Sequence, residues 1–176
     1  MNRKVGHVTV WENVGDIALS EILPWCLTNS GVDTLLFTSR KSFDLSGKGG
    51  YDNAIDPAVR KILGTKLIAS FEARGWPGTK LINNKGRVYV SELDDQMVEK
   101  IAKIQNNLFT WLQKGPAPLP EDLCVFKRGA KLPVLISHSV DREAFVISEN
   151  CPQGFNASSL SLEDLNIWSG KYFCRI

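Results

Sequence analysis

The sequence contains only two histidines, His7 and His138, and its four cysteines occur without a CxxC pair or another short metal-ligand spacing. A zinc or transition-metal site needs several such side chains close together. We therefore expect neither a metal nor a cofactor. A mechanism that uses a histidine as general base would have to use one of these two residues.

Long apolar runs are also missing. No stretch approaches the roughly 18 apolar residues of a membrane-spanning helix, and polar residues interrupt the most apolar part of the N-terminal third, namely Asp16, Glu21 and Asn29. Residues 1–16 lack the apolar block of a secretion signal. We therefore expect a cytoplasmic protein with no membrane partner and with reduced cysteines, although their even number keeps a disulfide possible.

The chain has no strong excess of charge of either sign, because its net charge is +2. Nucleic-acid-binding domains are usually far more basic, so this balance argues against a nucleic-acid partner. The charge is nevertheless uneven, since residues 40–80 hold eight Lys or Arg residues against four acidic ones. This segment is the one electrostatic asymmetry that could attract an anionic ligand.

What remains is an ordinary globular composition, with 43% hydrophobic and 23% charged residues in 176. This length predicts a single domain over residues 1–176. The predicted fold class is α+β, with a mixed, mostly antiparallel sheet packed against about three helices. The oligomeric state is left open.

The most regular helical pattern lies near residues 92–114. Six apolar residues recur there at gaps of three or four and share one face of a helix: Leu93, Met97, Ile101, Ile104, Leu108 and Leu112. Ser91 and Asp94 have the spacing of a capping box at the start. Gly115 and Pro116 favour an end at residue 114. We expect the whole stripe to face the interior.

The remaining elements follow from apolar spacing and turn residues. A strand at 5–11, a helix near 17–27 and a strand at 32–38 permit a parallel strand pair, and Pro24 should kink or split that helix. Asp56 and Pro57 favour a helix running to Gly75. Further strands are predicted at 80–90, where two are joined by a turn, and at 123–127, 132–139 and 143–148.

A glycine-rich loop, Ser46 to Gly50, is the first candidate site. Backbone amides freed by glycines beside Lys48 could hold a phosphate, with Arg40, Lys41 and Arg60 nearby in sequence. The spacing does not match the GxxxxGK[ST] motif. A surface loop without a ligand explains the same residues.

A cysteine nucleophile is the second candidate. Cys151 stands in a loop rich in proline and glycine, while Cys124 lies among apolar strand residues and is expected to be buried and inert. His138 could draw off the thiol proton, and Asp141 could orient the ring. Such residues are more often structural than catalytic.

Several short motifs resemble small bacterial domains of uncharacterised function. They are Trp76-Pro-Gly-Thr79, Leu108-Phe-Thr-Trp111, Pro120-Glu-Asp-Leu-Cys124 and the hairpin of residues 132–147, in that order. The resemblance covers the C-terminal hundred residues and implies no activity, substrate or catalytic residue.

Together these features favour a non-enzymatic module that binds another protein. The size and mixed architecture are those of bacterial immunity or accessory proteins. Two alternatives stay open: an anion- or nucleotide-binding protein that uses the loop at 46–50, and a hydrolase or transferase that depends on Cys151 and His138.

Overall fold

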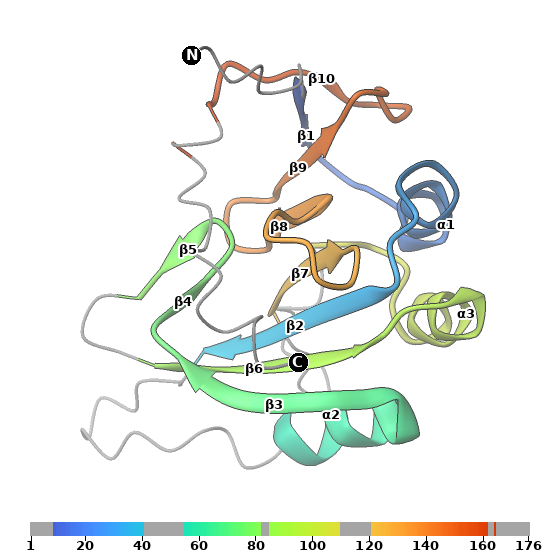
Figure 1. Cartoon of the computed structure of the whole chain (residues 1–176), viewed down its shortest axis with the longest axis vertical. Coiled ribbons are helices and arrows are strands. Elements are labelled where there is room, and N and C mark those ends of the chain that lie inside the picture. The colour runs from blue at the N-terminus through green and yellow to red at the C-terminus, as the bar shows by residue number, and fades with distance from the viewer. Residues whose placement is uncertain (1–8, 41–54, 82–84, 110–120, 162–163, 165–176) are drawn as a thin grey trace.

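A computed structural model describes residues 9–40, 55–81, 85–109, 121–161 and 164. The strands in Figure 1 are β1 (Thr9–Val14), β2 (Thr34–Arg40), β3 (Leu67–Ala73), β4 (Gly75–Trp76), β5 (Thr79–Lys80), β6 (Gly86–Glu92), β7 (Glu121–Phe126), β8 (Leu135–His138), β9 (Glu143–Ser148) and β10 (Asn156–Ala157). The helices are α1 (Leu19–Ser30), α2 (Ile55–Leu63) and α3 (Asp95–Ile104), and a short 3-10 turn, η1 (Gly64–Lys66), follows α2. Within these ranges no helix is long and apolar enough to cross a membrane.

Eight strands form one sheet in the order β10-β1-β9-β8-β7-β2-β6-β3, and every neighbouring pair is antiparallel. The predicted α+β class, an antiparallel sheet with three helices, is confirmed. The parallel strand pair suggested for the N-terminal part is wrong, because β1 and β2 are not neighbours in the sheet. Among the described strands, β4 and β5 pair only with each other and form a separate small hairpin.

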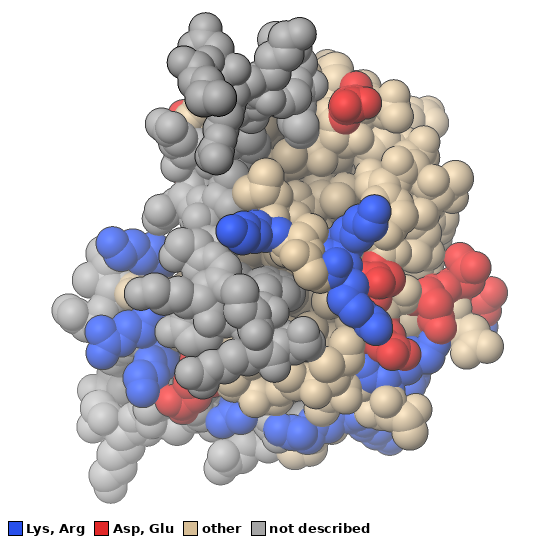
Figure 2. All heavy atoms as spheres, viewed as in Figure 1, with Lys and Arg blue, Asp and Glu red and all other residues tan. Residues whose placement is uncertain are grey.

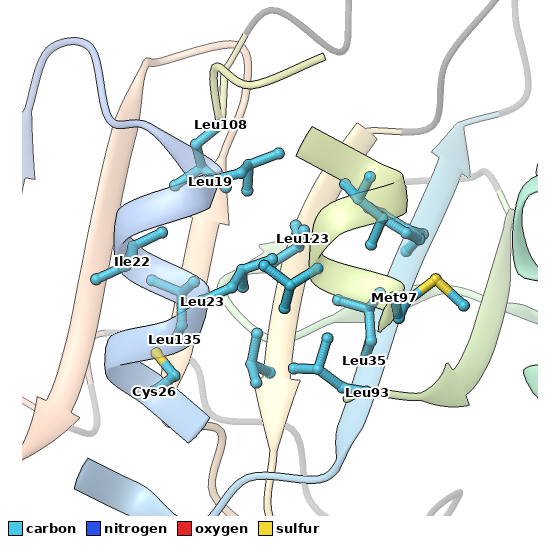
Figure 3. Close-up of a cluster of buried hydrophobic side chains, with 14 of the residues drawn as sticks. Leu19, Ile22, Leu23, Cys26, Leu35, Leu93, Met97, Leu108, Leu123 and Leu135 are labelled. Atoms are coloured by element: carbon cyan, nitrogen blue, oxygen red, sulfur yellow. The ribbon is translucent and has the colours of Figure 1, made fainter. Parts of the chain in front are cut away.

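The sheet buries apolar side chains on both faces, as expected when successive strand residues point to opposite sides. One cluster joins the three helices to the sheet, and Figure 3 shows side chains of α1 and α3 meeting there above the strands. The other cluster lies on the opposite face and includes Trp76 of β4, which is 1% exposed. Trp76 therefore anchors the small hairpin to that face.

The predicted helix near 92–114 is shorter in the structure. The Asp94 side chain caps it by accepting a hydrogen bond from the Met97 N–H at 2.9 Å, and α3 ends at Ile104. Ile104 is 45% exposed, so its predicted inward orientation is wrong. Leu108 is buried as predicted, although it follows the helix and donates its N–H to the Ile17 carbonyl at 2.9 Å. Residues 110–114 lie outside the described part.

The helix predicted from Asp56 to Gly75 is also shorter, because α2 ends at Leu63. Gly64 has a φ of +57°, a left-handed conformation that ends a helix and suits glycine. Leu67 and Phe71, predicted to extend the helical stripe, belong instead to β3, which pairs with β6. Pro24 neither splits nor ends α1, which is continuous from Leu19 to Ser30.

The three strands predicted in the C-terminal third are confirmed in position, although β8 begins three residues later than predicted. The ranges 123–127, 132–139 and 143–148 correspond to β7, β8 and β9. The two strands expected within 80–90 are β5 and β6, but β5 pairs with β4 rather than with β6. Of the strand predicted at 5–11, the described residues 9–11 belong to β1, which continues to Val14.

Candidate functional site

A groove of about 520 Å³ lies between α1 and α3. Pro24, Val98 and Ala102 give it apolar surface, and charged side chains stand along α3. The remaining lining residues are Ser20, Asp95, Glu99, Lys103 and Asn106. Because α3 turns Met97 and Ile101 into the core, its opposite side is left to form this groove.

Two residues shape the groove, Pro24 of α1 and Asn106. Pro24 lacks an N–H and cannot donate the usual helical hydrogen bond to the Ser20 carbonyl, so it leaves that acceptor without this partner. Asn106, which follows α3, joins the end of that helix to the start of α1. Its carbonyl accepts the Leu19 N–H at 2.7 Å, and its side-chain oxygen accepts the Ser20 N–H at 2.8 Å.

A second hollow, of about 480 Å³, adjoins the groove and shares Asn106 with it. Asp16 and Glu21 are its charged lining residues. Asp16 accepts a hydrogen bond from Asn107 Nδ2 at 2.8 Å and pairs with Arg142. The Asn107 hydrogen bond, with the charge of Arg142, lowers the pKa of Asp16 below its ordinary value of 3.8. Asp16 therefore carries its negative charge throughout the neutral range.

Together the two hollows are acidic. Their lining holds four carboxylates, from Asp16, Glu21, Asp95 and Glu99. Lys103 pairs with Glu99 at 3.5 Å and Arg142 pairs with Asp16, so two negative charges remain in excess among these six side chains. Figure 2 shows Asp and Glu side chains gathered on the side of the molecule where α3 lies in Figure 1. The lining contains no cysteine, histidine or tyrosine. The groove thus offers apolar contact and negative charge.

The structure does not bring the predicted cysteine site together. His138 pairs with Glu143 at one end of β9, while Cys151 follows the other end of that strand. Five residue steps along β9 alone span about 16 Å, beyond hydrogen-bond reach. The exposed Cys151 Sγ lies 3.3 Å from the carbonyl oxygens of Pro152 and Phe155. Asp141 is exposed in the turn between β8 and β9.

His138 instead packs against the small hairpin. Its ring meets Phe145 edge-on, with the ring centroids 5.7 Å apart. Nε2 is buried without a hydrogen-bond partner among the described atoms and lies against Gly78. This position, shielded by the hairpin, fits a packing role.

The other described cysteines are inert, as predicted for Cys124. Burial, with the nearby charge of Asp122, raises the pKa of Cys124 well above its ordinary value of 9.0. Burial also raises the pKa of Cys26 to about 12. Neither thiol ionises near neutral pH, so neither is a ready nucleophile.

Most of the predicted anion-site residues cannot be compared with the structure. Lys41, Lys48 and the side chain of Arg40 lie outside the described part. Arg60 is exposed on α2. Among the described residues, no three His, Cys, Asp or Glu side chains lie close enough together to hold a metal ion.

A buried cluster around Asp122 was not predicted. Its carboxylate accepts hydrogen bonds from Trp76 Nε1 at 2.8 Å, Thr79 Oγ1 at 3.3 Å and the Ser139 N–H at 2.8 Å. The Asp122 N–H in turn donates to Ser139 Oγ at 3.0 Å. Asp122 is fully buried and has a φ of +35°. The cluster fastens the β4–β5 hairpin to the sheet.

Sequence reasoning missed both features for the same reason. The groove and the Asp122 cluster each join residues distant in sequence, and no local spacing marks them. For the cluster, one local signal was available: Asp122 is an acidic residue inside an apolar strand pattern, and a buried carboxylate needs several hydrogen-bond donors.

Compared with protein-family models, curated proteins and solved structures, the chain shows no significant match to any of them.

Proposed function

We propose that this chain is a non-enzymatic protein-interaction module that binds a basic segment of a partner protein in the groove between α1 and α3. The observation that carries the proposal is the combination of apolar surface and unbalanced negative charge in two adjoining hollows. Such a surface suits a segment with lysine or arginine beside small apolar side chains. An immunity or accessory role, in which one protein masks another, is consistent with this mode of binding.

The shape of the groove supports a polypeptide ligand. Ala102 is small enough for another backbone to approach closely, and Pro24 adds apolar surface on the facing helix. The Ser20 carbonyl, which Pro24 cannot engage, is an acceptor for a lysine or arginine of the partner. Because both hollows lie on one side of the molecule, a single extended or helical segment can reach them together.

The test compares two charge-matched variants. The probe is a fluorescent synthetic helix of lysine, leucine and alanine, and its counterpart carries glutamate in place of lysine. Asp95→Lys with Glu99→Lys should weaken binding of the basic probe by about tenfold or more. The control, Asp141→Lys with Glu149→Lys, changes two exposed acids outside the groove and adds the same charge.

The control separates a docking site from general attraction. We expect it to bind the basic probe as tightly as the unmodified protein does, and neither protein to bind the acidic helix. Equal loss in both double variants would mean that only net charge matters and would overturn the groove as the site. No binding of the basic probe at low ionic strength, where charge attraction is strongest, would refute the proposed partner chemistry.

The two alternatives draw no support from the described residues, but each has its own test. Binding of a nucleotide that is lost in Lys48→Ala would favour the anion-binding alternative. Turnover of any substrate, abolished by Cys151→Ala or His138→Ala, would favour the hydrolase or transferase alternative. Either result would replace the interaction module as the primary function.

A further inference from the structure

A second charged surface, independent of the acidic groove, lies where β3 leads into the small β4–β5 hairpin. The sequence from residue 73 to residue 91 contains four basic residues and no acidic one. We call these four residues the basic patch: Arg74, Lys80, Lys85 and Arg87. Arg87 is partly buried, and the other three are exposed. Figure 2 shows Lys and Arg side chains gathered on the side of the molecule where β4 and β5 lie in Figure 1.

Backbone pairing brings the members of the patch together, with Arg74 at the centre. On one side, the Arg74 carbonyl accepts the Leu81 N–H at 2.9 Å, directly beside Lys80. On the other side, β3 and β6 pair up to the residues that directly precede Arg74 and directly follow Lys85. Arg87 lies two residues further along β6. Four positive charges that are spread over 14 residues of sequence therefore meet at one end of the sheet.

The neighbouring acid does not cancel this charge. Glu72, near the end of β3, pairs with Lys85 at 3.3 Å and opposes Arg87 in the strand register. Four positive charges against this one negative charge leave three in excess among the five side chains. The net charge of the whole chain, +2, conceals the patch because the hollows beside α1 and α3 hold an excess of acids.

The composition of the patch indicates the kind of partner. The centre of a protein–protein interface is usually apolar or aromatic and poor in lysine. Here the tryptophan of the hairpin, Trp76, is only 1% exposed, and its Nε1 donates to the Asp122 carboxylate at 2.8 Å, so it offers no aromatic anchor. Surfaces that bind nucleic acid are polar and strongly positive, because many of their contacts are made to phosphates.

We propose that the basic patch binds the phosphate backbone of a double-stranded nucleic acid without reading its sequence. Because Trp76 is buried, the hairpin has no aromatic ring that can stack on an unpaired base. A surface that acts through charge alone gains most from a dense row of phosphates, and duplex DNA carries one negative charge per about 1.7 Å. The bond from Trp76 to Asp122 holds the hairpin to the sheet, so its lysine is presented on a fixed support.

The first test measures binding of a short fluorescent DNA duplex by anisotropy over a range of salt concentrations. The variant is Arg74→Ala with Lys80→Ala. The control, Lys127→Ala with Lys131→Ala, removes the same charge at two exposed residues between β7 and β8. β2 pairs at its first residue with the end of β7 and at its last residue with the start of β6. The control turn and the patch thus lie at opposite ends of β2, about 20 Å apart.

Loss of two phosphate contacts should weaken binding by about tenfold or more at low salt. It should also make the dependence of log K on log salt shallower by about 2. We expect the control to match the unmodified protein in both measurements. Equal loss in the two double variants would mean that only net charge matters and would overturn the patch as the site. Absence of duplex binding at low ionic strength would also overturn the proposal.

The second test separates the possible anionic partners by competition against the labelled duplex. The competitors are unlabelled DNA and RNA duplexes, single-stranded DNA and polyglutamate, at equal concentrations of charge. We expect the duplexes to compete best and polyglutamate to compete least. The stronger of the two duplexes identifies the preferred nucleic acid. Polyglutamate that competes as well as a duplex would point to an acidic protein segment instead, and stronger competition by the single strand would exclude a duplex; either result would overturn the proposal.

Discussion

The imidazole ring of His138 lies so close to Gly78 that a Cβ atom at residue 78 would stand 2.0 Å from Nε2. Gly78 also has a φ of +75°, a conformation that residues with a Cβ rarely adopt. Gly75, at the start of the same hairpin, is equally confined, because a Cβ there would come within 2.6 Å of the Thr79 carbonyl oxygen. The Gly75–Lys80 hairpin therefore requires both glycines.

Gly78→Ala should lower the free energy of unfolding by about 2 kcal/mol or more, because backbone strain and a steric clash act together. Gly129→Ala is the matched control, since Gly129 has a φ of +76° with no atom within 4 Å of the added Cβ. It should cost only the strain, about 1 kcal/mol. Urea denaturation of both variants measures the difference. Equal losses would show that His138 does not confine residue 78.

Asp122→Ala should be more damaging, because it leaves Trp76 Nε1 and the Ser139 N–H buried without their acceptor. Each unsatisfied donor costs about 1–3 kcal/mol, so we expect a loss of about 3 kcal/mol or more. Asp141→Ala, at an exposed aspartate, should leave the stability unchanged. Similar denaturation midpoints for the two variants would contradict the role of Asp122 as the hairpin's anchor.

These effects illustrate what the sequence could and could not predict. The strands from Leu123 to Ser148 were predictable because apolar runs alternate there with turn residues, and such signals are local. The end of α3 was not, because Ile104, Leu108 and Leu112 continue the helical spacing. The chain nevertheless leaves the helix, since Asn106 and Asn107 bind α1 and Asp16 instead. Here tertiary hydrogen bonds outweigh helical periodicity.

The candidate site was still less predictable. Ser20 and Pro24 meet residues of α3 only because the two helices lie side by side over the sheet. The predicted pairing of Cys151 with His138 required the two ends of β9 to come together, which an extended strand does not allow. What could be inferred was the chemistry of single residues, such as the burial of Cys124 and the accessibility of Cys151. Their arrangement could not.

The thiols should differ in reactivity. In the native protein, a thiol reagent at neutral pH should label Cys151 and should spare Cys26 and Cys124, which become reactive after unfolding in urea. Mass spectrometry of peptides from the labelled protein assigns each site. Native labelling of Cys26 at the rate of Cys151 would contradict its burial.

Cys26 also predicts a loss of stability in alkaline solution. Its pKa is about 12 in the folded protein because of burial, against an ordinary value of 9.0. Above pH 9 the unfolded chain loses this proton while the folded chain retains it, so stability falls as the pH rises from about 9 to 12. The contribution is at most about 1.4 kcal/mol per pH unit. Over that pH range, the urea midpoint of Cys26→Ala should fall less steeply with pH than the midpoint of the unmodified protein. The same slope for both proteins would contradict the raised pKa of Cys26.

The stabilisation that Asp94 gives α3 should also depend on pH. Unlike the effect of Cys26, it should weaken as the solution becomes more acidic. A hydrogen bond from Lys66, with a second from the Met97 N–H, lowers the pKa of Asp94 below its ordinary value of 3.8. The stabilisation is therefore present above that value and is lost as the pH falls through the lower pKa of the folded state.

At neutral pH, Asp94→Ala should cost about 1 kcal/mol through loss of the helix cap. Asp95→Ala, one residue further on, removes a neighbouring exposed carboxylate that is not the cap, and it should cost less. Urea midpoints at neutral pH and at pH 3 measure both effects. If Asp94→Ala were as harmful in acid as at neutral pH, the carboxylate charge would not be the source of the stabilisation.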